Sequence, residues 1–305
     1  MSRTVVMPSS KPSPRRAGAK ALRDWYVPRR TAYPWRETRD PYAIWVSEVM
    51  LQQTQASRVV PAFRDFLARF PTVRALAAAP RRDVVRAWDG LGYNRRAVWL
   101  SEGARAIVHE HRGRMPRDPQ TLRTLPGVGP YTAAAISSIA FGEPVAVVDT
   151  NVRRVVARVH LGVDGRQART RRVWELAQAW LDRQDPVTWN QAVMDLGREV
   201  CRPRPRCDVC PLARACAFRT SGAVATRGKG ATDAFEGSSR QVRGAIVRTL
   251  RAHEPLTPGR LAAETGFKVE RVDAAIDGLA ADGLVERTAG RSGSRPERHP
   301  IRSVR

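Results

Sequence analysis

Apolar residues recur at helical spacing through the first two-thirds of the chain. Between about residues 17 and 218 they return every three to four positions, which places them on one face of an α-helix. Pro and Gly residues separate the apolar segments, and no alternating pattern typical of strands interrupts them. The pattern predicts helices at residues 43–52, 57–69, 83–89, 96–109, 130–141, 150–160, 171–182 and 188–200.

The two ends of the chain have different patterns. Residues 1–20 carry five basic residues and no acidic one, so we expect a disordered basic arm, which lacks the apolar region of a signal peptide. Residues 219–238 are rich in Gly, Ser, Thr and Ala, which is typical of a linker. Residues 239–290 predict helix, helix, turn at Gly266, helix and a short strand, a winged-helix-like domain. Residues 291–305 are predicted to be a basic tail.

The charge balance narrows the class of partner. Lys and Arg number 53 against 29 Asp and Glu, which gives a formal net charge of +24 in 305 residues. Such an excess indicates a polyanionic partner, most simply nucleic acid. The hydrophobic fraction of 42% is enough for packed cores. No apolar run reaches the roughly 18 residues of a membrane span, and we expect a cytoplasmic, nucleoid-associated protein with no membrane partner.

The segment "LPGVG" at residues 125–129 lies between two predicted helices. Gly127 and Gly129 permit a tight turn that residues with side chains make less easily. Backbone N–H groups at the start of the following helix can hold a phosphate. The pattern is that of a helix-hairpin-helix that binds the DNA backbone, and an ordinary turn between helices is the alternative.

Glu48 is the only charged residue in the stretch from Ala43 to Ser57. Burial of a lone carboxyl raises its pKa, which suits a general acid near neutral pH. Ser47 is a candidate N-cap, and a Glu in the first helical turn, favoured by the helix dipole, is the alternative. The amide and hydroxyl groups of Gln53 and Thr54 can fill a gap in a base stack or read a base edge.

Asp149 follows the apolar run Val145–Val148 and precedes a basic helix. Asp is a preferred N-cap, and a cap is the simplest local interpretation. The arginines that follow suit a surface facing the DNA backbone and help to keep the carboxylate ionised; they are Arg153, Arg154 and Arg158.

All cysteines of the chain fall within one short segment, at Cys201, Cys207, Cys210 and Cys216. This clustering argues against a secreted disulfide framework and for a metal site in a reducing compartment. Four thiolates at this spacing can bind zinc or an iron–sulfur cluster, and ligand chemistry alone leaves both open.

Five motifs together resemble the MutY family of adenine DNA glycosylases, which belongs to the helix-hairpin-helix glycosylase superfamily with an iron–sulfur cluster. They are "PWR" at 34–36, "SEVMLQQTQ" at 47–55, "GLGYNRRA" at 90–97, "LPGVGPYTAAAI" at 125–136 and "VVDTNVRRV" at 147–155. The resemblance covers residues 21–218 and implies a mainly α, two-lobed fold. A six-helix lobe is expected at about 42–150, and a cluster lobe at 21–41 and 150–218.

The resemblance implies hydrolysis of the N-glycosidic bond of adenine mispaired with 8-oxoguanine or guanine, after the base is flipped out of the duplex. Glu48 matches the general acid, and Asp149 matches the carboxylate that stabilises the sugar cation. Tyr131 and Asn151 match residues that support this carboxylate. Because Tyr131 stands where endonuclease III has a catalytic Lys, little strand cleavage is expected.

The resemblance also implies the other ligands. The cysteines would hold a [4Fe–4S] cluster, and the partner would be double-stranded DNA containing an adenine mispair, bound by a monomer. Residues matching positions near the flipped adenine or the vacated stack are Trp35, Arg36, Leu51, Gln53, Tyr93 and Asp195.

The chain departs from the family in two places. The gap between its first two cysteines has five residues instead of six, and a winged-helix-like domain replaces the Nudix-like domain of many members. In this domain we expect modest phosphate contacts, from Arg240, Arg243, Lys268 and Arg271. Two alternatives remain, a thymine–guanine mismatch glycosylase and a non-catalytic iron–sulfur DNA-binding regulator. The presence of both Glu48 and Asp149 argues against the regulator.

Overall fold

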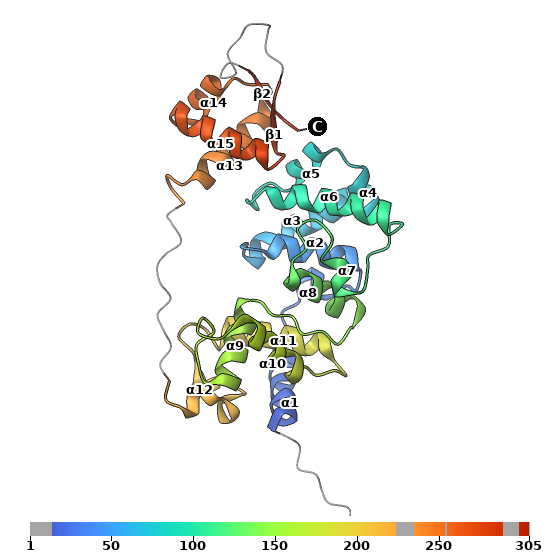
Figure 1. Cartoon of the computed structure of the whole chain (residues 1–305), viewed down its shortest axis with the longest axis vertical. Coiled ribbons are helices and arrows are strands. Elements are labelled where there is room, and N and C mark those ends of the chain that lie inside the picture. Colours follow the sequence, from blue (N-terminus) through green and yellow to red (C-terminus); the bar gives the residue numbers. More distant parts are fainter. Residues whose placement is uncertain (1–13, 224–234, 254, 289–298, 305) are drawn as a thin grey trace, which may run out of the picture. The chain divides into compact units, whose positions relative to one another are not determined.

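The computed structural model describes residues 14–223, 235–253, 255–288 and 299–304 and is mainly α-helical (Figure 1), as predicted. The helices of the first 223 residues are α1 (Pro14–Tyr26), α2 (Pro41–Leu51), α3 (Ala56–Arg69), α4 (Val73–Ala78), α5 (Arg81–Ala87), α6 (Arg95–Glu110), α7 (Pro119–Leu122), α8 (Pro130–Phe141), α9 (Thr150–Leu161), α10 (Thr170–Trp180), α11 (Pro186–Glu199) and α12 (Ala217–Thr220). In the part of the chain that is described, no helix is long and apolar enough to cross a membrane.

These elements form two compact units. One contains α1 and the chain from Ala134 to α12. The other contains Tyr33–Ala133 together with the C-terminal part of the chain, from Lys229 onward. The division falls inside α8, earlier than the predicted boundary at about residue 150. The C-terminal domain therefore shares a unit with α2 to α7.

Helix α2 is the most deeply buried element of its unit, with residues 42–50 all buried. Its sequence is apolar on every side, which is typical of a helix enclosed by others. In the same unit α4 and α5 pack against α6, as Figure 1 shows. Phe66, Trp88 and Leu100 are almost completely buried there. A charged side chain on α2 is consequently removed from water.

The other unit is built around α9, which packs against α10, α11 and α12. Helix α1 packs against α10 and α11 and contributes Leu22 and Tyr26 to the same core. Because α1 begins at Pro14, the predicted disordered arm over residues 1–20 is wrong for its last part. The remainder of the predicted arm lies outside the described residues.

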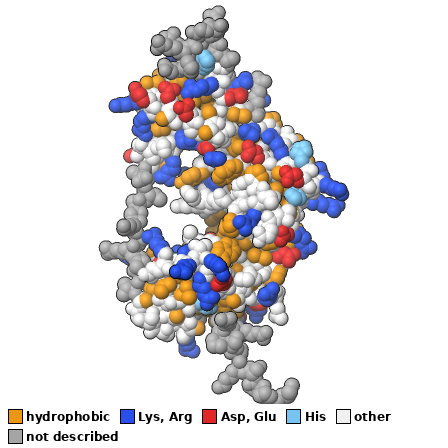
Figure 2. All heavy atoms as spheres, in the orientation of Figure 1, with side chains coloured by type: hydrophobic (Ala, Val, Ile, Leu, Met, Phe, Trp, Pro, Cys, Tyr) orange, Lys and Arg blue, Asp and Glu red, His pale blue; other side chains and the backbone are white. Residues whose placement is uncertain are grey.

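The described residues of the C-terminal domain form the helices α13 (Ser239–Ala252), α14 (Pro258–Thr265) and α15 (Val269–Ala281) and the strands β1 (Val285–Arg287) and β2 (Ile301–Ser303). The strands pair antiparallel, with Val285 opposite Ser303. This order of elements is winged-helix-like. On the face shown in Figure 2, acidic and basic side chains are interspersed over this domain.

The predicted basic tail over 291–305 is wrong for residues 301–303. Ile301 is fully buried and forms a bridge with Leu256, so this segment belongs to the domain. The strand was missed because three residues are too few to show an alternating pattern. Residues 291–298 lie outside the described part.

Candidate active site

Glu48 lies in the second half of α2 and has only 6% of its surface exposed. The helix is capped by Asp40, whose carboxylate accepts hydrogen bonds from the backbone N–H groups of Tyr42 and Ala43. Ser47 is therefore an interior residue, and its hydroxyl donates to the carbonyl of Ile44 at 2.8 Å. The prediction of Ser47 as the cap is wrong. The position of Glu48 also removes the alternative of a first-turn Glu favoured by the dipole.

Tyr131 contacts this buried carboxyl directly. Its hydroxyl donates a hydrogen bond to Oε2 of Glu48 at 2.7 Å. The next residue, Thr132, accepts from Nε2 of Gln52 at 3.4 Å. The start of α8 thus lies against the end of α2 and orients the Glu48 side chain. The resemblance implied that Tyr131 supports Asp149, and the structure shows that its hydroxyl binds Glu48.

Gln53 and Tyr93 both adopt left-handed backbone conformations, with φ of 56° and 48°. Such a conformation is uncommon for residues with side chains and is maintained only where the surroundings impose it. Each of them directly follows a residue whose carbonyl accepts a hydrogen bond from the Arg96 guanidinium. This residue is Gln52 before Gln53 and Gly92 before Tyr93. Gln53 is exposed, and the exposed fraction of Tyr93 is 43%. The structure therefore presents these two predicted DNA contacts at the surface.

Arg96 joins the segment at the end of α2 to the segment at residues 91–92 through its hydrogen bonds. Its Nη1 donates to the carbonyls of Val49, Met50 and Gln52 at 2.6 to 2.9 Å. Its Nη2 donates to the carbonyls of Leu91 and Gly92 and to Oγ1 of Thr54. Burial lowers the pKa of Arg96 to about 10, so the side chain stays charged at neutral pH. Sequence reasoning missed this residue, although it lies within the "GLGYNRRA" motif.

Of the other predicted contacts in this unit, Trp35 belongs to the core. It is 7% exposed and stacks on Tyr33 with a centroid distance of 4.9 Å. The Arg36 guanidinium lies 5.3 Å from the centre of the Tyr33 ring. Leu51 and Thr54 are half-buried. Trp35 is therefore buried in the core of this unit, whereas Gln53 and Tyr93 are exposed at its surface.

The predicted hairpin lies between α7 and α8. Gly127 has a φ of 72°, and a Cβ there would approach Cβ of Trp99 to 2.7 Å. Gly129 has neither constraint, since no protein atom lies within 4 Å of where its Cβ would stand. Only Gly127 is required for the conformation of the turn. The open space at Gly129 leaves its backbone accessible to a ligand.

Asp149 is the N-cap of α9, as the local sequence predicted. Its Oδ1 accepts from the N–H of Val152 at 2.6 Å, and its Oδ2 accepts from Nδ2 of Asn151 at 2.9 Å. Burial raises the pKa of Asp149 above its usual value, while these hydrogen bonds and the charge of Arg154 oppose the shift. The structure thus places Asn151 on Asp149, as the resemblance implied.

Two amide side chains hold the segment that leads to Asp149. Asn190, fully buried on α11, accepts from the N–H of Val147 at 2.8 Å and donates to the carbonyl of Val145. Gln178 on α10 accepts from the N–H of Ala146 at 2.9 Å. The extended segment over residues 145–147 has its backbone N–H and C=O groups paired by these amides, as a neighbouring strand would pair them in a sheet. Sequence reasoning missed both, because isolated amides in amphipathic helices carry no local signal.

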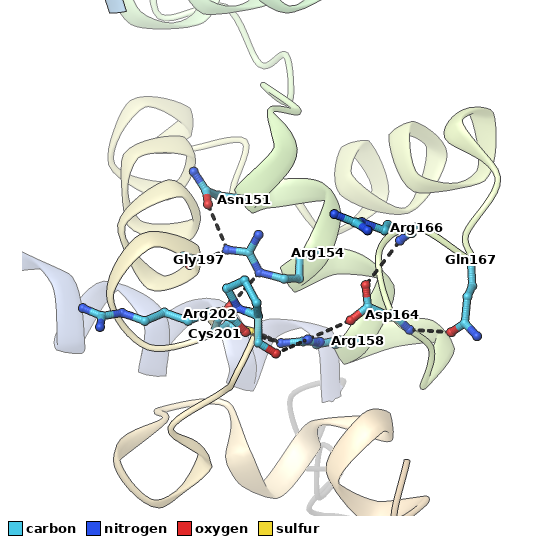
Figure 3. A network of polar contacts seen from close by, with 10 residues as sticks. Asn151, Arg154, Arg158, Asp164, Arg166, Gln167, Gly197, Cys201 and Arg202 are labelled. Carbon is cyan, nitrogen blue, oxygen red and sulfur yellow. Dashed lines mark hydrogen bonds and ion pairs between the residues drawn. The ribbon is translucent and has the colours of Figure 1, made fainter. Parts of the chain in front are cut away.

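Arg154 connects Asn151, the partner of Asp149, to the cysteine segment (Figure 3). Its Nη2 donates to Oδ1 of Asn151 at 2.8 Å and to the carbonyl of Gly197 at 2.6 Å. Its Nε donates to the carbonyl of Cys201 at 2.6 Å. A continuous chain of hydrogen bonds therefore runs from the backbone of a cysteine through Arg154 and Asn151 to the Asp149 carboxylate.

The arginines of α9 bind protein groups, contrary to the prediction that they form a surface facing the DNA backbone. Arg158 is 1% exposed and pairs with Asp164 at 2.8 Å. It also donates to the carbonyl of Arg202 at 2.6 Å, within the network of Figure 3. Arg153 donates to the carbonyl of Gly165 at 2.8 Å. They fasten the loops on either side of α9.

The four cysteines line one pocket, together with apolar side chains and the arginines Arg158, Arg206 and Arg219. Burial raises the pKa of the Cys201 thiol, and it raises that of Cys210 to about 11. Buried thiols of this kind remain neutral unless a cation or metal compensates the thiolate. Among the residues described, no three His, Cys, Asp or Glu side chains are grouped closely enough to hold a single metal ion.

Asp195, the remaining predicted residue, lies on α11. It is 4% exposed and pairs with Arg198 at 3.1 Å. Glu48, Tyr131, Gln53, Thr54 and Tyr93 belong to one compact unit, whereas Asp149, Asn151, Asp195 and the cysteines belong to the other.

Comparison with known proteins identifies the family. A family model described as HhH-GPD superfamily base excision DNA repair protein matches residues 46–186. A protein of Mycolicibacterium smegmatis named adenine DNA glycosylase is 42% identical over 271 residues, which cover 88% of this chain and 92% of that protein. The chain belongs to the adenine DNA glycosylase family. The family and fold predicted from the motifs are confirmed.

Other members differ in how much of the chain they share. The Mycobacterium tuberculosis protein of the same name is 42% identical over 293 residues, which cover 92% of this chain and 96% of that protein. The Homo sapiens protein is 44% identical over 211 residues, covering 65% of this chain and 39% of its own. The mycobacterial match therefore extends into the C-terminal domain.

Solved structures show the same fold. A thermostable thymine-DNA glycosylase has a TM-score of 0.64 at 30% identity and covers 68% of this chain and 97% of its own. A trapped endonuclease III–DNA covalent intermediate has a TM-score of 0.59 at 22% identity, covering 68% of this chain and 96% of its own. The second likeness is one of fold alone.

Proposed function

We propose that the protein hydrolyses the N-glycosidic bond of adenine mispaired with 8-oxoguanine or guanine in duplex DNA. The observation that carries this proposal is the buried carboxyl of Glu48 with the Tyr131 hydroxyl bound to it at 2.7 Å. Glu48 is the one ionisable acid in a helix that is otherwise apolar and buried, and a carboxyl held out of water in this way suits a group that holds and delivers a proton. Relatives named adenine DNA glycosylase support the choice of base.

The reaction begins when the target adenine leaves the base stack, at a cost of a few kcal/mol. The protonated Glu48 then donates its proton to the adenine ring, and the bond between the base and C1′ breaks with its electron pair leaving on adenine. Asp149 stabilises the cation that forms on the sugar, either electrostatically or by a transient bond. Water adds to C1′ and loses a proton, which leaves free adenine and an abasic site.

Tyr131 bears on whether the DNA strand is cleaved after the base is released. Its phenol orients Glu48 and has no amine that could form a Schiff base with the abasic sugar. We infer that the protein is largely monofunctional and leaves the DNA strand intact. Leu51, Gln53, Thr54 and Tyr93 are inferred to contact the bases around the site, and Gly129 the backbone phosphates.

We infer that the cysteine pocket holds a [4Fe–4S] cluster. All four cysteines line this one pocket, and thiolates are the ligands that iron–sulfur clusters use. When bound, the cluster would supply a rigid cross-link of the segment from Cys201 to Cys216. We also infer that the protein acts as a monomer at the nucleoid, since its charge of +24 favours polyanions.

Base release from three duplexes tests the proposal. Duplexes containing 8-oxoguanine:A, G:A and G:T are incubated with the protein and the free bases are separated. Adenine released from the first two supports the proposal, and the same reaction with Glu48→Gln is the control. Thymine released from G:T alone would favour the thymine glycosylase that the neighbour of 30% identity suggests. Duplex binding without base release would favour the regulator.

A further inference from the structure

The C-terminal domain is fastened to the helices of its own unit by ion pairs. Asp282, just after α15, accepts from Nη1 of Arg95 at the start of α6 at 2.7 Å, and it also pairs with Arg243 of its own domain. Arg251 pairs with Asp89 and donates to the carbonyl of Val85 at 2.8 Å. Two separate anchors therefore join α13 and α15 to the region of α5 and α6.

Each anchor has one shielded and one exposed side chain. Asp282 and Arg251 have 16% and 15% of their surface exposed, whereas their partners Arg95 and Asp89 have 52% and 64% exposed. Apolar side chains from both sides line a small pocket beside them, among them Val85, Val247 and Leu284. Ion pairs that are partly buried are screened less by salt than exposed ones. The C-terminal domain thus has a defined position against the region of α5 and α6 in the same unit.

In this position a side chain of α13 contacts Tyr93. Nη1 of Arg240 donates to the Tyr93 hydroxyl at 2.9 Å. The guanidinium of Arg96 lies 5.7 Å from the centre of the same ring. Tyr93 is thereby held at both ends, by Arg96 near its strained backbone and by Arg240 at its hydroxyl. An exposed aromatic side chain held in this way loses less conformational entropy when a ligand orders it.

The arginines expected to contact phosphates are used within the protein. Arg243 pairs with Asp282 and Arg240 binds Tyr93. Arg271 donates to the carbonyl of Gly237 at 2.6 Å. The helix that follows the turn of this domain also carries exposed acidic residues, Glu270 and Asp277. These contacts weaken the expectation that the domain works mainly by adding phosphate contacts.

We propose that Arg240 is a positioning residue through which the C-terminal domain orients Tyr93 for recognition of the mispair. This inference rests on the proposed function, since it assigns the domain a part in the specificity of that same site. The hydrogen bond from a charged donor to the phenol is the physical link, and it is stronger than one between neutral groups. The domain acts on the duplex through Tyr93 rather than as an independent DNA-binding module.

Duplex affinity tests the proposal, measured in the Glu48→Gln background so that turnover does not interfere. Arg240→Gln and Tyr93→Phe each remove one end of the hydrogen bond. Each is expected to weaken binding of the 8-oxoguanine:A duplex by roughly threefold to tenfold and to narrow its preference over G:A. The affinity of the double variant for the duplex is expected to equal that of whichever single variant binds less tightly. The two losses do not add, because both changes remove the same contact.

Arg248→Gln is the matched control, because Arg248 is an exposed arginine on the same helix and its replacement removes the same charge. It is expected to leave the preference for 8-oxoguanine:A over G:A unchanged. Arg240→Lys, which keeps a charged donor, is expected to restore most of that preference. Thermal unfolding of each variant shows whether the fold is intact, and if Arg240→Gln has lowered stability, Tyr93→Phe, which removes the other end of the same hydrogen bond, serves as the readout.

Two results would overturn the inference: equal effects of Arg240→Gln and Arg248→Gln on the preference, or effects of Arg240→Gln and Tyr93→Phe that multiply. Adenine release by the wild-type protein is measured separately and tests the proposed function. Release without coupling between the two residues overturns this inference alone. Coupling without release overturns the proposed catalysis and leaves mispair recognition by Arg240 and Tyr93 supported.

Discussion

Two carboxyl groups carry the proposed chemistry, and their immediate surroundings differ. Glu48 is enclosed by an apolar helix and receives a hydrogen bond from a phenol. Asp149 caps a helix and receives hydrogen bonds from a backbone N–H and an amide. The first environment suits a group that must hold and deliver a proton. The second, with donors on both oxygens, suits a group that must carry negative charge.

Replacement of Glu48 by Gln removes the proton while it keeps the size and shape of the side chain. We expect the single-turnover rate of adenine release to fall by about 10² to 10⁴, with duplex affinity unchanged. Rapid-quench kinetics at saturating enzyme measure the rate. Asp65→Asn, an isosteric change on the exposed face of α3, is the control. Release at the wild-type rate would remove Glu48 from the role of general acid.

Asp149→Asn separates capping from catalysis. Asn caps nearly as well as Asp, so we expect most activity to be lost while the fold is kept. Because the pKa of Asp149 is raised by burial, its ionisation costs the native state stability. That cost is absent at low pH, where the group is protonated in both states, and appears as the pH rises through the native pKa.

The stability of Asp149→Asn relative to the wild-type protein should therefore increase as the pH rises above about 4, the usual pKa of an Asp side chain. Urea unfolding of both proteins from this pH upward measures the difference. The opposite slope, with the variant losing stability relative to the wild type as the pH rises, would mean that the carboxylate is mainly structural.

At the scale of elements, the position of α9 matters because it carries Asp149 at one end and faces the cysteine segment along its length. Arg154, one turn into the helix, donates to Asn151, Gly197 and Cys201. Its planar guanidinium reaches three acceptors in different directions, which an ammonium group on a flexible chain does not reproduce. The geometry at Asp149 is therefore tied to that of the cysteine segment.

Arg154→Gln should slow adenine release by roughly tenfold. Asn151 loses the donor that orients it, and the carbonyls of Gly197 and Cys201 lose their hydrogen-bond donor. Single-turnover kinetics and visible absorbance measure activity and the state of the cysteine pocket together. Arg171→Gln, at a side chain that is 93% exposed on α10, is the control and should leave both unchanged. An Arg154→Gln protein with the wild-type rate would show that the network does not act on Asp149.

At the scale of the whole molecule, the cofactor inferred from the cysteines makes a simple prediction. Protein purified anaerobically should contain iron and inorganic sulfide in equal amounts and show broad visible absorbance. Cys207→Ser should lower the iron content and duplex binding more directly than the chemical step, since the hydrogen bonds that lead from the cysteine segment to Asp149 start at the backbone of Cys201 and not at Cys207. Stoichiometric zinc without iron would replace the cluster with a structural metal ion.

Much of this protein was determined by patterns that are local along the chain. Helical periodicity predicted the fold class, and the five motifs predicted the family, because each depends on residues close together in sequence. Asp149 was also predicted as the cap of α9, since a cap is set by three or four consecutive residues. The winged-helix-like domain was recognised from its order of elements, although strand β2 was too short to detect.

Only the tertiary structure decided which distant groups meet. Glu48 is bound by Tyr131, and the arginines of α9 turn toward carbonyls and Asp164 instead of DNA. Arg96, Asn190 and Gln178 satisfy backbone groups of segments far from them in sequence. Their partners are backbone atoms, which look the same at every residue, so no sequence pattern marks them. The cost of leaving buried polar groups unpaired selects such contacts only once the chain is folded.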